Sequence, residues 1–144
     1  MAGKVRIAAF ASGGGTNLQA IMDASESGRI NAEVVLVVSN KPDAGALDRA
    51  RRHGIPTEHV PVGKDLSAQF HAADEQHVAL LHRYDVDLVV LAGYMRRIGP
   101  GVLAAFPLRV MNIHPALLPS FPGAHGQRDA VNKGVKISGC TVHF

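Results

Sequence analysis

"FASGGGTNLQAIMDA", residues 10–24, joins the end of an apolar, strand-like run to a stretch of helical periodicity through three consecutive glycines. Glycine allows sharp turns and lets a backbone approach a ligand closely. The free amide N–H groups and the positive dipole end at the start of a helix favour an anion such as phosphate. The loop therefore predicts an anion site. The alternative is a plain tight turn with Thr16 or Asn17 as the N-cap residue.

Two common nucleotide-binding motifs are missing from this loop. It is not a P-loop, because no Gly-Lys-Ser or Gly-Lys-Thr follows the glycines. Leu18 stands where the third glycine of a dinucleotide motif belongs, and the next predicted strand is followed by Ser39 and Asn40 instead of an acidic residue. The residues thus predict a phosphate group at the loop without either nucleotide motif.

Apolar runs and helical stretches alternate along the whole chain. Strands are predicted over 5–11, 34–39, 57–60, 88–92, 110–113 and 137–144, and helices over 17–27, 44–53, 67–84, 99–105 and 127–133. Gly28, Gly54 and Gly134 follow three of these helices at C-cap positions. Several strands are apolar on both faces, which is typical of parallel strands covered by helices. We therefore predict an α/β fold with an open, mostly parallel twisted sheet and helices on both faces.

Composition limits the classes of function. The chain of 144 residues has no linker or repeat, so we expect one domain over 1–144. Cys140 is the single cysteine, which excludes an internal disulfide and fits the cytoplasm, and we expect it to be a small buried hydrophobe. The net charge of +3 and the few aromatic residues argue against a nucleic-acid partner. The first apolar run is too short for a membrane span or signal peptide, so we expect a soluble protein.

The polar, glycine-rich and proline-rich segments all follow predicted strands. They are SGGGTN (12–17), SNKPDAG (39–45), GYMRRIGPG (93–101) and HPALLPSFPGAHG (114–126). In open α/β sheets, ligands bind in the crevice beyond the carboxyl ends of the strands. We therefore expect the functional site at this edge of the sheet.

The segment MNIHP, residues 111–115, carries the chemistry at this edge. Residues two apart on a strand project to the same face, so Asn112 and His114 point together into the crevice. Asn supplies a neutral donor for an oxyanion, and His exchanges protons near neutral pH, which suits acyl-type transfer. No Ser or Cys accompanies them as a nucleophile, so we expect the substrate to supply the attacking group. The alternative is that His114 simply hydrogen-bonds a loop.

The remaining histidines separate by position. His125 lies in the loop that continues from His114, and it is a second candidate for the site. His143 is expected to pack on the last strand. Solvated surface positions are predicted for the others, which lack the spacing of a zinc motif: His53, His59, His71, His77 and His82.

Two features of the predicted ligand edge stay open. Arg96 and Arg97 are either solvated or line a pocket for a carboxylate or a flat ring system. The loop that follows His114 is dense in proline, and we expect one of its X-Pro bonds to be cis, at Pro115, Pro119 or Pro122.

Five segments taken in order closely resemble the phosphoribosylglycinamide formyltransferase family. They are ASGGGTNLQAI (11–21), VVSNKPDAGALDRA (37–50), VVLAGYMRRIGP (89–100), MNIHPALLPSFPGAHGQRDA (111–130) and GVKISGCTVHF (134–144), so the resemblance covers nearly the whole chain. It implies a Rossmann-like formyltransferase fold and no metal. It also implies formyl transfer from 10-formyltetrahydrofolate, as co-substrate, to the amine of phosphoribosylglycinamide in purine synthesis.

The resemblance also implies roles for single residues. The substrate's phosphoribosyl end would be held by Gly15, Thr16 and Asn17. The folate would be contacted, largely through backbone groups, by Met95, Arg96, Arg97 and Ile98, and also by Asn112. Asn112 and His114 would be catalytic. Phe70 stands nearest to a position where the family usually carries a folate-contacting Arg.

Family members continue past TVHF, residues 141–144, into a loop with an Asp that orients the catalytic His. We therefore expect the chain to be a C-terminally truncated form, with formyl transfer far below the family's usual level. Two readings compete with a transferase. One is a formyltetrahydrofolate hydrolase, which shares the Asn and His pair but usually carries an extra N-terminal domain. The other is a catalytically impaired module that binds a phosphate ligand.

A third relative, the formyltransferase that acts on initiator methionyl-tRNA, would need a further RNA-binding domain, and none is visible in the sequence. The expected partners are therefore the small molecules phosphoribosylglycinamide and formylfolate. For the assembly, the alternatives are a monomer and a homodimer.

Overall fold

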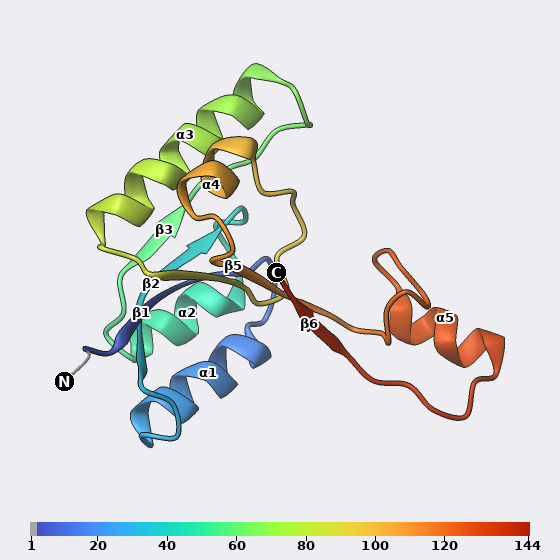
Figure 1. The fold of residues 1–144 in the computed structure, drawn as a ribbon. Coiled ribbons are helices and arrows are strands. Elements are labelled where there is room, and N and C mark those ends of the chain that lie inside the picture. Colours follow the sequence, from blue (N-terminus) through green and yellow to red (C-terminus); the bar gives the residue numbers. More distant parts are fainter. Residues whose placement is uncertain (1–2) are drawn as a thin grey trace.

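The computed structural model describes residues 3–144, which form a six-stranded sheet with five helices. The strands are β1 Val5–Phe10, β2 Ala32–Ser39, β3 Thr57–His59, β4 Leu88–Leu91, β5 Val110–His114 and β6 Thr141–His143. The helices are α1 Thr16–Glu26, α2 Gly45–Arg52, α3 Ala68–Arg83, α4 Pro100–Ala105 and α5 Gly126–Lys133 (Figure 1).

The strand order is β3-β2-β1-β4-β5-β6. Every neighbouring pair is parallel except the last, in which β6 runs antiparallel to β5. The prediction of an open, mostly parallel α/β sheet is confirmed. The last strand is much shorter than the predicted 137–144, since only three residues pair with β5.

Helices pack on both faces of the sheet. Successive side chains of a strand point to opposite faces, so a continuous apolar run presents apolar side chains to both. On one face, Phe10, Leu36 and Val38 pack in a cluster with residues of α3 and α4. On the other face, Ala9 and Val37 pack with residues of α1 and α2. The backbone of β1 and β2 is therefore buried on both sides, as the continuous apolar runs predicted.

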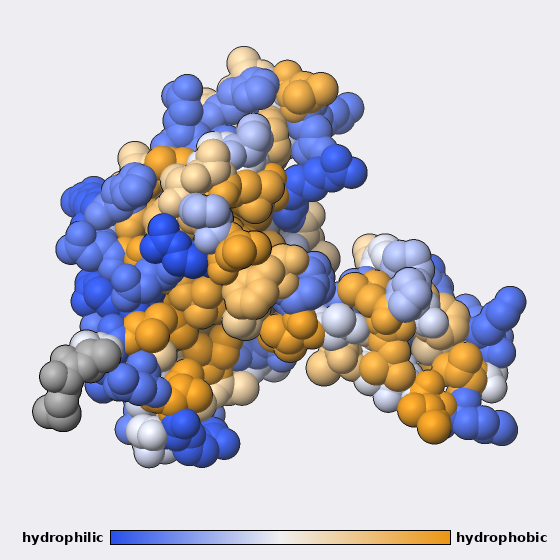
Figure 2. Space-filling model, in the orientation of Figure 1, coloured by the Kyte–Doolittle hydropathy of each residue, from blue (hydrophilic) through white to orange (hydrophobic). Residues whose placement is uncertain are grey.

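Two parts of the molecule are less enclosed. The α5 helix stands apart from the sheet at the end of two connecting segments (Figure 1). Beside α1, the sheet face carries an apolar hollow of about 560 Å³. Figure 2 shows that apolar residues also gather on the surface of the face that it draws. The lining of the hollow comes from α1 and from five strands, β1, β2, β4, β5 and β6, and includes Val5, Ile7, Ile21, Val90, Met111, Ile113 and Val142.

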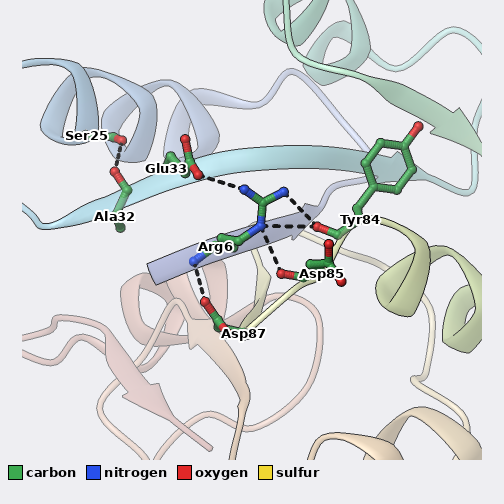
Figure 3. Close-up of polar contacts among 7 residues, drawn as sticks. All are labelled: Arg6, Ser25, Ala32, Glu33, Tyr84, Asp85 and Asp87. Carbon is green, nitrogen blue, oxygen red and sulfur yellow. Dashed lines mark hydrogen bonds and ion pairs between the residues drawn. The ribbon is translucent and has the colours of Figure 1, made fainter. Parts of the chain in front are cut away.

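Arg6 organises the edge of the sheet opposite to the predicted ligand edge (Figure 3). Its guanidinium donates to the carbonyl oxygens of Tyr84 at 3.0 Å and Asp85 at 3.0 Å, where α3 ends, and to the Glu33 carboxylate at 2.9 Å. The Arg6 backbone N–H donates to the Asp87 carboxylate at 2.9 Å. A cation at the carboxyl end of a helix satisfies its last carbonyls and its dipole, so Arg6 fixes α3 to β1 and β2.

Three burial predictions are wrong. His77 is buried on α3, because it lies on the helix face that packs against the sheet. Cys140 and His143 are exposed, since β6 is a short edge strand without a covering helix. The other histidines predicted to be on the surface, including His71 and His82, are exposed.

The predictions for the C-cap glycines and for a cis X-Pro bond are confirmed. The three C-cap glycines have the positive φ values of 72°, 68° and 72°, at Gly28, Gly54 and Gly134. The cis X-Pro bond is Leu118–Pro119. Within residues 3–144, no helix combines the length and the apolar character that crossing a membrane requires.

Candidate active site

The glycine loop leads into α1 without a side-chain cap. Gly15 is the N-cap residue, with φ 78°, and the first helical bond runs from the Gln19 N–H to its carbonyl at 2.9 Å. The reading in which Thr16 or Asn17 caps the helix is therefore wrong. Glycine is needed here, because a Cβ would also lie 2.7 Å from the Cα of Ala46 on α2.

The carbonyl groups of this loop are tied to α2. The Ala46 N–H donates to the Gly13 carbonyl at 3.0 Å, and Arg49 Nε donates to the Gly14 carbonyl at 2.6 Å. Arg49 Nη1 also donates to Gln19 Oε1 on α1 at 3.2 Å. Because these carbonyls are held on the α2 side and the N-cap residue Gly15 makes no side-chain cap hydrogen bond, the amide groups at the start of α1 are left for an anion.

Sequence reasoning missed the role of Arg49 in this loop. The signal that could have identified it is its position: residue 49 follows one helical turn after the start of α2, at the predicted ligand edge.

Asn112 and His114 on β5 share one hollow. This hollow, of about 210 Å³, is called here the histidine hollow, and its lining also includes Gly93, Tyr94 and Met95 from the segment after β4. Ile113, which lies between them on the strand, also lines this hollow, so the common direction of the two side chains stays a prediction. The β5 pair therefore lies beside the segment that the family resemblance assigns to folate.

His114 also contacts the loop that follows it. Its Nε2 lies 2.9 Å from the carbonyl oxygen of Phe121, and because a carbonyl only accepts, Nε2 must carry the hydrogen. In the neutral ring, Nδ1 is then the atom that can accept a proton. The loop contact thus orients the imidazole at the edge of the histidine hollow.

Asn112 contacts a histidine that the sequence did not place in the site. The Asn112 Nδ2 lies 3.3 Å from Nε2 of His143, which is its cross-strand neighbour on β6. Sequence reasoning missed this pair because the register of an antiparallel edge strand depends on the connection between β5 and β6.

The segment after β4 forms a second hollow of about 340 Å³, called here the arginine hollow. It is lined by Tyr94, Arg96, Arg97 and Ile98, by Asn112 and His143 from the sheet, and by four further residues that are all apolar. Asn112 lines both hollows. The residues expected to contact folate therefore gather around Asn112, with Met95 in the histidine hollow and the other three in the arginine hollow.

Tyr94 links this segment to the core. Burial raises the pKa of its phenol to about 12, while the charge of Arg96 acts in the opposite direction. The hydroxyl therefore stays protonated at neutral pH, and its oxygen has no hydrogen-bond partner within residues 3–144. Its ring packs edge-on against Phe10 at a centroid distance of 5.3 Å, so the segment is seated directly on β1.

Several predicted residues lie outside both hollows. His125 is exposed at the N-cap of α5 and lines neither of them. Thr16 and Asn17 are exposed at the start of α1 and also line neither hollow. Phe70 is buried in α3, so its side chain contributes to the core.

The fold is that of the formyl transferases. That family matches residues 5–144, and the chain belongs to it.

Among its relatives, the chain is 40% identical over 143 residues to the phosphoribosylglycinamide formyltransferase of Escherichia coli (strain K12), covering 97% of this chain and 65% of that protein. It is also similar to the crystal structure of glycinamide ribonucleotide transformylase 1 from Symbiobacterium toebii, with a TM-score of 0.91 and 49% identity, over 98% of this chain and 66% of that one.

A more distant likeness is to a formyltetrahydrofolate deformylase from Pseudomonas syringae pv. tomato str. DC3000. Its crystal structure gives a TM-score of 0.88 at 31% identity, over 99% of this chain and 46% of that one. The chain thus spans less than two thirds of the length of each of these three relatives.

Proposed function

We propose that this chain takes part in formyl transfer from 10-formyltetrahydrofolate to the amine of phosphoribosylglycinamide, a step of purine synthesis. The observation that carries the proposal is the shared lining of the histidine hollow by Asn112, His114 and Met95. This hollow brings together a hydrogen-bond donor (Asn112), a proton-exchanging group (His114) and the proposed folate-binding segment (Met95). The names of the E. coli and S. toebii relatives support the same substrates.

The glycine loop is the proposed phosphate site. Gly15, Thr16 and Asn17 begin α1, where uncapped amide groups and the helix dipole favour a phosphate. Arg49 supports this by holding the Gly14 carbonyl away from the ligand side. The loop would thus anchor the substrate while its amine reaches toward β5.

The arginine hollow and Met95 are the proposed folate site. A flat ring system needs apolar walls and a few polar groups that fix its orientation. Leu91, Ile98 and Leu103 supply apolar walls, while the backbone of Met95, Arg96 and Arg97 supplies hydrogen-bonding groups. The reacting formyl group would then lie near Asn112, which borders both hollows.

The chemistry follows from the groups around that point. The substrate amine attacks the formyl carbon, and the new C–N bond turns the formyl oxygen into an oxyanion. The Asn112 amide donates to this oxygen, which stabilises charge that develops only in the transition state. The amine gives up a proton, the bond to the folate nitrogen breaks, and that nitrogen receives a proton, for which His114 Nδ1 is the exchanging group.

The test is a formyl-transfer assay that follows tetrahydrofolate release with and without phosphoribosylglycinamide. For Asn112→Ala we expect kcat to fall by about 10² to 10³, as for the loss of a single oxyanion donor, with little change in phosphoribosylglycinamide binding. Asn31→Ala, at the opposite edge of the sheet, is the matched control. Equal losses of substrate binding and kcat would mean that Asn112 is only structural.

The same assay separates the competing readings. Tetrahydrofolate release that does not need the amine would indicate a hydrolase, to which the likeness with the P. syringae deformylase points. Binding of phosphoribosylglycinamide without any release would indicate a binding module.

A further inference from the structure

A buried hydroxyl joins the two proposed substrate sites. Ser12 follows β1, is only 3% exposed, and begins the glycine loop. Its Oγ accepts a hydrogen bond from the Met95 N–H at 2.8 Å and donates to Asn40 Oδ1 at 2.5 Å. The Ser12 N–H also donates to the Gly93 carbonyl at 3.0 Å. One residue thus holds the loops that follow β1, β2 and β4.

The hydroxyl has one hydrogen and is therefore fixed in direction. Because Asn40 Oδ1 can only accept, the Ser12 O–H must point at it. A lone pair of the same oxygen then faces the Met95 N–H. The orientation of Ser12 toward Met95 consequently depends on Asn40, a residue that lines neither hollow.

The segment between residues 93 and 99 is held at its other end by a different element. Asp74 on α3 accepts hydrogen bonds from the Gly101 N–H at 2.7 Å and the Val102 N–H at 3.1 Å, which caps α4. Between the two anchors, residues 95–97 are exposed. Asp74 therefore fixes the segment to α3, whereas Ser12 fixes it to the glycine loop.

We propose that Ser12 is a positioning residue that sets the proposed phosphate site and the proposed folate segment at a fixed separation. This inference rests on the proposed function. Ser12 itself touches neither substrate, because its hydroxyl is buried and both of its hydrogen-bonding partners are protein groups. Ser12 therefore affects the rate through the alignment of the two bound substrates. A displacement of about 1 Å between reacting groups can lower a rate about 100-fold.

Ser12→Ala is the informative variant, because it removes both side-chain bonds and leaves the backbone bond in place. We expect kcat for formyl transfer to fall by about 10- to 100-fold, while the KM for each substrate changes by less than about threefold. Ser25→Ala is the matched control, since Ser25 also donates a hydroxyl hydrogen bond, to the Ala32 carbonyl at the opposite edge of the sheet. It should leave kcat unchanged.

Asn40 provides a second, independent arm. Asn40→Ala removes the acceptor and should reproduce part of the Ser12→Ala loss, whereas Asn40→Asp keeps an acceptor oxygen and should restore most of the rate. The double variant Ser12→Ala/Asn40→Ala should lose no more than Ser12→Ala alone, because both act through one hydroxyl. Losses that multiply, or a kcat for Ser12→Ala equal to that of Ser25→Ala, would overturn the proposal.

Hydrogen exchange separates failure of this proposal from failure of the proposed function. Inorganic phosphate, as a probe for the glycine loop, should slow amide exchange in residues 93–98 of the unsubstituted chain but not of Ser12→Ala. Absence of formyl transfer together with this difference would reject the proposed function and keep the Ser12 link. The same exchange response in both chains would reject the link, whatever the activity.

Discussion

Acidification should destabilise this protein through a single buried histidine. His77 lies on α3, is 2% exposed, and packs its ring edge-on against Phe10 at a centroid distance of 5.0 Å. Burial lowers the pKa of His77 from 6.5 to about 4, although the nearby carboxylate of Asp74 acts in the opposite direction. The imidazole is therefore neutral in the folded chain at any pH above about 4.

The sign and size of the effect follow from linkage between protonation and folding. Below pH 6.5 the unfolded chain binds a proton at His77 that the folded chain refuses, so the free energy of unfolding falls as the pH is lowered. The loss ends near pH 4, where both states are protonated. At about 1.4 kcal/mol for each pKa unit, a lowering from 6.5 to about 4 corresponds to about 3 kcal/mol.

The variant His77→Phe keeps an aromatic ring against Phe10 and removes the titration. Urea unfolding followed by circular dichroism at pH 7.5 and pH 4.5 would measure the free energy of unfolding of both chains. We expect the variant to gain about 2 to 3 kcal/mol relative to the unsubstituted chain over this interval. Carboxylates remote from His77 affect both chains alike and cancel in the comparison.

His71→Phe is the matched control, since His71 lies on the same helix but is exposed. Its stability difference from the unsubstituted chain should not depend on pH. Parallel pH curves for His77→Phe and the unsubstituted chain would refute the reasoning, because they would mean that His77 is protonated equally in the folded and unfolded states.

Two further predictions concern the arginines at the two edges of the sheet. Arg49→Ala releases the Gly14 carbonyl and should weaken phosphoribosylglycinamide binding about tenfold by isothermal titration calorimetry, with Arg52→Ala as an unchanged control. Arg6→Ala removes the bonds to the end of α3 and should lower the free energy of unfolding by about 1 kcal/mol in urea titrations, with no effect on that binding. An Arg49→Ala variant that binds phosphoribosylglycinamide more tightly would contradict the first assignment. An Arg6→Ala variant that loses this binding while it is still folded would contradict the second.

The sequence predicted the elements of the fold because their signals are local. Strand alternation and helical periodicity depend on neighbours along the chain, and the observed bounds differ from the predicted ones mainly at the ends of elements. The spacing of Asn112 and His114 is also a local signal, since two residues of one strand share a face whatever surrounds them, and both residues line the histidine hollow.

Buried polar residues were harder to predict, although one signal was present. The buried face of α3 includes Phe70, Ala73, Asp74, His77 and Leu80, at the spacing of an apolar helix stripe. Asp74 and His77 are polar members of that stripe. Their residue types favour exposure, but their spacing along the helix indicated burial. The contacts of Ser12 could not be read in this way, because they join it to residues 28 and 83 positions away.

The strand order explains why the two proposed substrate sites need a link such as Ser12. The chain builds β1, β2 and β3 toward one edge of the sheet and then returns to place β4 beside β1. At this reversal the loop after β1 leads to α1 on one face, whereas the segment after β4 leads to α4 on the other face. A crevice opens between diverging loops of this kind. The proposed phosphate and folate sites therefore belong to opposite faces, and the hydrogen bonds of Ser12 cross the reversal between them.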